Sequence, residues 1–115
     1  MANGTLKMDD IEYFSNSLTT GPNVTGLSAD CFRNGRMIYM TVSWKGPVTG
    51  TEPIFTVPAN YRPKQYWHGT GVFVKNGVEA WGNYTINPNT GDVYQNLTSG
   101  AVTAGSFTMI YPLGE

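Results

Sequence analysis

The sequence contains a single cysteine, Cys31, and a single histidine, His68, among its 115 residues. One cysteine excludes a disulfide within the chain, and a chain of this length can build one hydrophobic core without such a link. We therefore expect one domain in which Cys31 is a small buried hydrophobic residue. A nucleophilic triad or a zinc site would have to use His68, and no spacing of ligand-type residues indicates either site.

Charge is also scarce, because charged residues make up only 13% of the chain and the formal net charge is −1. The seven lysines and arginines are scattered, so the sequence offers no basic patch for a nucleic acid backbone. No apolar run approaches the roughly 20 residues of a membrane-spanning helix, and no apolar signal-peptide core is evident at the N-terminus. The sequence therefore indicates neither a nucleic acid partner nor insertion into a membrane.

Carboxylates could still serve hydrolysis, since glycosidases use two of them on opposite sides of the scissile bond. Glu79 and Asp92 could form such a pair, but so could any two of the eight acidic residues. The short Gly69-Thr70-Gly71 segment is too little for a phosphate-binding loop. We therefore expect a protein that is not an enzyme and that needs no cofactor or metal.

The pattern along the chain predicts β-strands, because helical periodicity is nearly absent. Residues 8–18 could form about one turn of helix, although asparagine and serine weaken it. The clearest strand covers residues 36–44, with Ile38, Met40, Val42 and Trp44 on one face and Met37, Tyr39, Thr41 and Ser43 on the other. Both faces carry apolar side chains, which predicts contact with a core on one side and with a neighbouring subunit on the other.

Turn signals divide the rest of the chain into further short strands. The segments "RNG" and "KNG" indicate hairpins of the Asn-Gly kind. Further strands are expected at residues 54–57, 72–74, 78–81, 84–86, 93–97 and 106–111, with Phe107 and Met109 buried. Short strands at spacings of about ten residues are typical of an antiparallel β-sandwich or a jelly-roll-like barrel.

Aromatic and polar residues gather in a way that suits sugar binding, where an aromatic ring covers the C–H face of the sugar and polar groups bind its hydroxyls. The candidate ligand-binding residues are Tyr66, Trp67, His68, Trp81 and Asp92. Residues 66–68 cannot all face one core, because successive side chains of a strand alternate between faces. Two interpretations stay open at this point, a saccharide groove near a subunit boundary and a strand that enters the core.

Several motifs resemble the receptor-binding tip (head) domains of phage tail fibres and baseplates. They are "FRNGRMIYMTVSW", "IFTVPANYRPKQYWHGTGV" and the closing "SFTMIYPL", which together extend over residues 31–113. The resemblance implies a β-sandwich or jelly-roll-like head over residues 27–115, assembled as a homotrimer on the virion. It also implies attachment to host cell-wall or surface polysaccharide, or to teichoic-acid-like polymers. Residues 1–26 would then be a neck that binds other tail proteins.

The most specific part of the resemblance is the turn "VPANYRP". Val57, Pro58, Tyr61, Arg62 and Pro63 stand where the family's turn has them, and Asn60 replaces a glycine. Asparagine tolerates the left-handed conformation, so the turn can survive this change.

Two alternatives to a receptor-binding tip stay open. One is a structural tail or capsid decoration protein without a ligand, and the other is a cellular lectin-like module from a prophage remnant. The chain is either a small accessory tip protein or a piece of a longer one.

Overall fold

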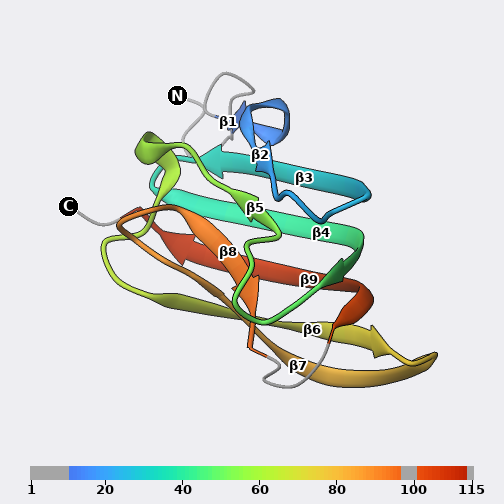
Figure 1. Ribbon diagram of the computed structural model, residues 1–115. Helices are drawn as coiled ribbons and strands as arrows, with labels where there is room; N and C mark the ends of the chain where they lie inside the picture. Colours follow the sequence, from blue (N-terminus) through green and yellow to red (C-terminus); the bar gives the residue numbers. More distant parts are fainter. Residues whose placement is uncertain (1–10, 97–100, 114–115) are drawn as a thin grey trace, which may run out of the picture.

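The computed structural model describes residues 11–96 and 101–113, which form an all-β domain. Nine strands make one antiparallel sheet in the order β1-β3-β4-β9-β6-β7-β8-β5-β2, and the sheet curls into a half-barrel (Figure 1). The strands are β1 (Ile11–Tyr13), β2 (Thr19–Thr20), β3 (Gly26–Asn34), β4 (Met37–Val48), β5 (Phe55–Thr56), β6 (Trp67–Lys75), β7 (Val78–Ile86), β8 (Asp92–Gln95) and β9 (Val102–Pro112). The prediction of an antiparallel all-β fold is confirmed in the form of one curled sheet.

The inner face of the curl holds the hydrophobic core. The predicted inward face of β4 is confirmed, because Ile38, Met40, Val42 and Trp44 are all buried. Phe107 and Met109 of β9 are buried beside them, as is Cys31 of β3, and these predictions are also confirmed. Trp44 donates a hydrogen bond from Nε1 to the Tyr84 hydroxyl at 3.1 Å, so its single polar atom is satisfied inside the core.

Strands β6 and β7 carry glycine on the inner face, where neighbouring atoms leave no room for a side chain. A Cβ atom at Gly71 would lie 2.0 Å from the carbonyl oxygen of Ser106, and one at Gly82 would lie 1.8 Å from the Phe73 ring. No larger residue fits at such distances without a shift of the neighbouring strand or ring. Glycine at these positions therefore lets the sheet bend toward its own inner face.

Both predicted hairpins are present, but only the second has the predicted Asn-Gly turn, since the two-residue loop of the first is Gly35-Arg36. Asn34 pairs with Met37 in the first, and Gly35 has a positive φ of 61°. Lys75 pairs with Val78 in the second, where Asn76 and Gly77 have positive φ values of 53° and 76°, as a two-residue Asn-Gly turn requires. The strands beside the second turn are longer than predicted, and the separately expected strand at 84–86 is the end of β7.

The described part of the predicted neck belongs to the same sheet as the rest of the chain. β1 pairs with β3 and β2 pairs with β5, while Phe14 is buried and stacks on Tyr61 with 4.1 Å between ring centroids. The Phe14 amide donates to the carbonyl of Cys31, and the Cys31 amide donates to the Ser15 hydroxyl. The helical turn expected at residues 8–18 is replaced by β1 and the 3₁₀ turn Ser15–Ser17, and residues 8–10 lie outside the described part. The attachment role of residues 1–26 stays a prediction.

The turn at residues 57–63 is held by Arg62 and Tyr61. Arg62 donates from Nε to the carbonyl of Val57 at 2.8 Å and from an Nη to the carbonyl of Asn89 at 3.0 Å. Tyr61 donates its hydroxyl proton to the carboxylate of Glu12, while its carbonyl accepts from the Tyr111 hydroxyl. The expectation that Asn60 would use the left-handed conformation is wrong. This residue lies within the 3₁₀ turn Ala59–Tyr61, where φ is not positive.

Candidate functional site

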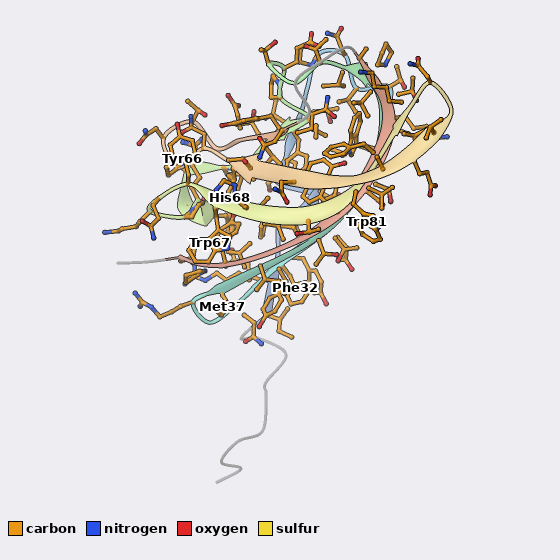
Figure 2. All side chains as sticks on the ribbon, turned by 90° about the horizontal axis from the view of Figure 1, so that it is seen from below. Phe32, Met37, Tyr66, Trp67, His68 and Trp81 are labelled. Carbon is orange, nitrogen blue, oxygen red and sulfur yellow. The ribbon has the colours of Figure 1, made fainter. Side chains whose placement is uncertain are left out.

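The three consecutive residues Tyr66, Trp67 and His68 are divided between the two faces of the sheet. Tyr66 precedes β6 and is 51% exposed, and its hydroxyl accepts a hydrogen bond from Nδ2 of Asn87 at 3.1 Å. Trp67 begins β6 on the inner side, where it is half-buried and packs against the core. His68 faces outward and is exposed (Figure 2). The predicted alternation is confirmed, and of the two alternatives it is the Tyr66/His68 pair, and not Trp67, that faces outward.

The outer face of β6, β7 and β8 brings three of the five predicted residues together. Strand register places His68, Thr85 and Tyr94 in one row, and the next row contains Tyr66, Asn87 and Asp92. We call these six residues the polar strip. Tyr94 and Asp92 lie two residues apart on the same face of β8. The pKa of Tyr94 is raised by burial first and then by the nearby Tyr66 and Asp92.

Hydrogen bonds within the strip determine which of its groups can donate to a ligand and which can accept from it. Nδ1 of His68 lies 3.0 Å from the Thr85 hydroxyl, which also accepts a hydrogen bond from Nδ2 of Asn96 at 2.7 Å. Because the Thr85 oxygen already accepts from Asn96, its own proton can go to Nδ1 of His68. This arrangement suits the tautomer in which Nε2 carries the proton, so His68 offers a donor to a ligand.

Asp92 supplies the complementary acceptor. One carboxylate oxygen, Oδ1, accepts from the Thr56 hydroxyl at 2.7 Å, which fixes the orientation of the side chain. The other, Oδ2, makes no hydrogen bond with a residue in the described part of the chain. A carboxylate oxygen accepts stronger hydrogen bonds than a neutral group does. The strip therefore combines two tyrosine rings, one donor and one charged acceptor on three adjacent strands.

Trp81 does not belong to this strip. It lies on the outer face of β7 opposite Val72, two rows of side chains along from Thr85, and it is 79% exposed. Figure 2 shows it well separated from Tyr66 and His68. The predicted grouping of Trp81 with Asp92 is wrong, because the register places Asp92 level with Asn87, three rows of side chains from Trp81.

The outer face of the central strands forms a hydroxyl-rich surface that sequence reasoning missed. Register aligns the polar side chains across β3, β4, β9 and β6 into two rows, Asp30-Thr41-Thr108-Thr70 and Ser28-Ser43-Ser106-Val72. A shallow hollow of about 400 Å³ lies over these rows, and Trp81 forms one of its walls. The alternation of Thr41 with Ser43, and of Ser106 with Thr108, was the available signal, but only the register aligns these strands.

The described residues show no arrangement of reactive groups around Cys31. The thiol is buried in the core, and its pKa is raised to about 12 by burial first and then by the charge of Asp30. A thiol with such a pKa stays protonated at neutral pH and is a poor nucleophile. Within residues 11–96 and 101–113, no group of three histidine, cysteine or carboxylate side chains could hold a metal ion.

In the part of the chain that the structure describes, no helix has the length and apolar character needed to cross a membrane. No protein-family model matches the sequence, and no curated protein sequence matches it either. Membership of the tail-tip family therefore stays a prediction from the motifs.

Proposed function

We propose that this chain is the receptor-binding head of a phage or prophage tail, and that it attaches to host cell-surface saccharide through the polar strip. The observation that carries the proposal is the grouping of Tyr66, His68, Tyr94 and Asp92 on one outward face. Their backbone positions belong to paired strands or, for Tyr66, adjoin one, so little conformational freedom is lost when a ligand binds.

The chemistry of the strip matches that of a sugar ring. The exposed face of Tyr66 can cover the apolar C–H face of a pyranose, and Nε2 of His68 can donate to a hydroxyl. Asp92 can accept from a second hydroxyl through Oδ2, as a charge-assisted hydrogen bond. Such a site has few contacts and binds weakly by itself, so attachment gains from several copies acting together.

A homotrimer supplies those copies. The apolar side chains on the outer face support it, since Ile110 is exposed while Met37 and Tyr39 are half-buried. A contiguous apolar patch of this kind marks an interaction surface in a soluble protein. In such an assembly the sandwich form implied by the resemblance would arise between sheets of neighbouring subunits. Residues 1–26 would join the head to other tail proteins.

The test is binding of the purified protein to a glycan array and to host cell-wall saccharide. We expect Tyr66→Ala, His68→Ala and Asp92→Asn each to weaken binding about tenfold or more, equivalent to about 1.4 kcal/mol, with the fold unchanged. Tyr13→Ala is the matched control, because this tyrosine is 62% exposed at the far edge of the sheet.

Two outcomes would contradict the proposal. Wild-type affinity in all three strip variants would mean that the saccharide binds elsewhere. A wild-type protein that binds no saccharide would favour the structural decoration role.

A further inference from the structure

The hairpin formed by β6 and β7 carries a large exposed apolar side chain. Trp81 is 79% exposed and Val78, at the turn, is 66% exposed. This part of β7 pairs with β6 alone among the described strands, so the hairpin end projects from the half-barrel (Figure 1). Tryptophan is among the residues that contribute most to protein–protein binding when a partner buries them. We call Trp81 and its neighbour Glu79 the knob.

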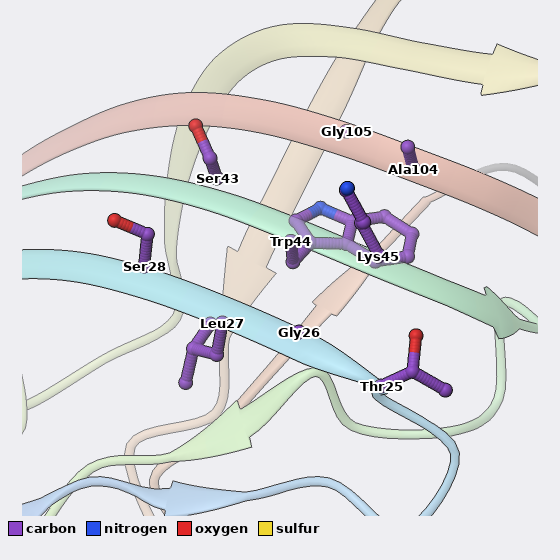
Figure 3. Close-up of a pocket in the computed structure, with 9 residues that line it drawn as sticks. All are labelled: Thr25, Gly26, Leu27, Ser28, Ser43, Trp44, Lys45, Ala104 and Gly105. Carbon is purple, nitrogen blue, oxygen red and sulfur yellow. The ribbon is translucent and has the colours of Figure 1, made fainter.

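A hollow lies at the opposite end of the same row of outer side chains. The row runs Ser28-Ser43-Ser106-Val72-Trp81 across β3, β4, β9, β6 and β7. The hollow has a volume of about 490 Å³, is open to solvent, and lies where the outward residues are small, over Gly26, Ser28, Ser43 and Ala104 (Figure 3). A cavity of about 150 Å³ already admits benzene, so this hollow is large enough for an indole ring.

The two ends of this face also differ in charge. The adjacent row runs Gly26-Lys45-Ala104-Val74-Glu79, so Lys45 borders the hollow and Glu79 belongs to the knob. Both side chains are exposed, and neither forms an ion pair with another described residue. A negative knob and a positive hollow are complementary in charge as well as in shape.

We propose that the knob of one subunit docks into the hollow of a second copy of this chain, with Glu79 facing the partner's Lys45. Each copy offers one knob and one hollow at opposite ends of one face, and in a head-to-tail arrangement the knob of each copy docks into the hollow of the next. Such contacts form a closed ring when the rotation between copies closes, which the trimer of the proposed function requires after three subunits. The inference rests on the trimer of the proposed function and does not depend on the saccharide site.

Light scattering on the full chain at about 50 μM tests the contact. We expect the wild type to have three times the chain mass of 12.6 kDa, and Trp81→Ala to have the mass of one chain. Glu79→Lys and Lys45→Glu should each raise the concentration needed for assembly about tenfold or more, since each brings like charges together. The double variant should recover most of that loss. Lys64→Ala, which changes an exposed residue outside the knob, the hollow and the apolar patch, should assemble as the wild type does.

The results distinguish a failure of the proposed knob contact from a failure of the proposed trimer. A trimer that persists in Trp81→Ala overturns the knob contact and leaves the trimer standing. A monomeric or dimeric wild type overturns both the trimer and the ring, while saccharide binding by the strip is measured independently. A charge-swapped double variant no better than its single variants overturns the pairing of Glu79 with Lys45. Because these side chains are exposed, we expect circular dichroism to show an unchanged fold in every variant.

Discussion

The two long hairpins of the sheet, β3–β4 and β6–β7, present different inner faces. In β4 every second residue from Ile38 to Trp44 places a large side chain in the core. In β6 the equivalent inward positions include Gly69 and Gly71, and β7 has Gly82. The first hairpin supplies core volume. The second receives the side chains of its neighbours, since Phe107 packs close to Gly71 and the Phe73 ring covers Gly82.

This difference shows where the half-barrel obtains its curvature. Where the sheet bends toward its inner face, large inward side chains on neighbouring strands would collide. One of the two strands must therefore carry glycine there. β9 lies between the hairpins, with Val42 paired to Phe107 on one side and Gly71 on the other. The large inward side chains of the β3–β4 hairpin and β9 therefore fit because the β6–β7 hairpin has glycine at inward positions.

The largest expected effect comes from removing the side chain that joins the two regions. Phe107 stacks on Tyr84 with 4.2 Å between ring centroids and is buried. Phe107→Ala should lower the free energy of unfolding by about 3–5 kcal/mol, measured by urea denaturation. Thr108→Ala, on the outer face of the same strand and outside the apolar patch, should change it by less than about 1 kcal/mol. Equal losses would mean that β9 has a different register.

A smaller effect is expected from adding one methyl group to the glycine region. Gly71→Ala would bring a Cβ atom to 2.0 Å from a backbone oxygen that belongs to the neighbouring strand. The resulting strain should lower the free energy of unfolding by about 1–3 kcal/mol. Gly26→Ala is the control, since its Cβ atom would meet only the Lys45 side chain at 3.8 Å. If both variants were equally stable, the curl would not depend on Gly71.

The smallest expected effects on the free energy of unfolding come from the turns of the two hairpins, and we expect the two turns to differ. Gly35→Ala and Gly77→Ala both force alanine into a positive φ, at 61° and 76°. We expect Gly35→Ala to lower the free energy of unfolding by about 1 kcal/mol, because both strands it joins are paired on their other sides as well. Gly77→Ala should lower it by less than about 1 kcal/mol, since the projecting hairpin end can open locally while the core stays folded. The reverse order in thermal or urea unfolding would contradict this comparison.

Local patterns predicted the features that depend on one strand or one turn. The alternation around Met40 gave the correct inward face, and "KNG" gave a correct turn, because side-chain period and turn chemistry act over a few residues. Gly69 and Gly71 concealed the first half of β6, since glycine weakens a strand pattern unless a close neighbour is known. The curling of all strands into one sheet, and the rows on its outer face, could not be read from single strands.

The candidate site could also be predicted only where it depends on a single strand. Residues 66–68 were correctly expected to alternate, but the sequence does not say which set faces outward, and Trp67 turned inward. Asp92 lies near His68 because Thr85 pairs with His68 on one side and with Tyr94 on the other, across the consecutive strands β6, β7 and β8. Trp81 lies apart because Asp92 is level with Asn87 of the neighbouring chain segment, three rows of side chains from Trp81. Each of these outcomes depends on the register between strands and on which face points outward, which one sequence does not reveal.

The way in which the first described residues are held determines how the domain would respond to mechanical force. A pull on Ile11 would peel the three pairs of β1 from β3 one at a time, which requires little force. The load would then reach Phe14 and Ser15, which are bonded to the backbone of Cys31 in the middle of β3. From there it would spread as shear along the nine-residue ladder between β3 and β4, where many hydrogen bonds must break together. The clamp at Cys31 thus acts as a mechanical stop that protects the half-barrel from unravelling at its first strand.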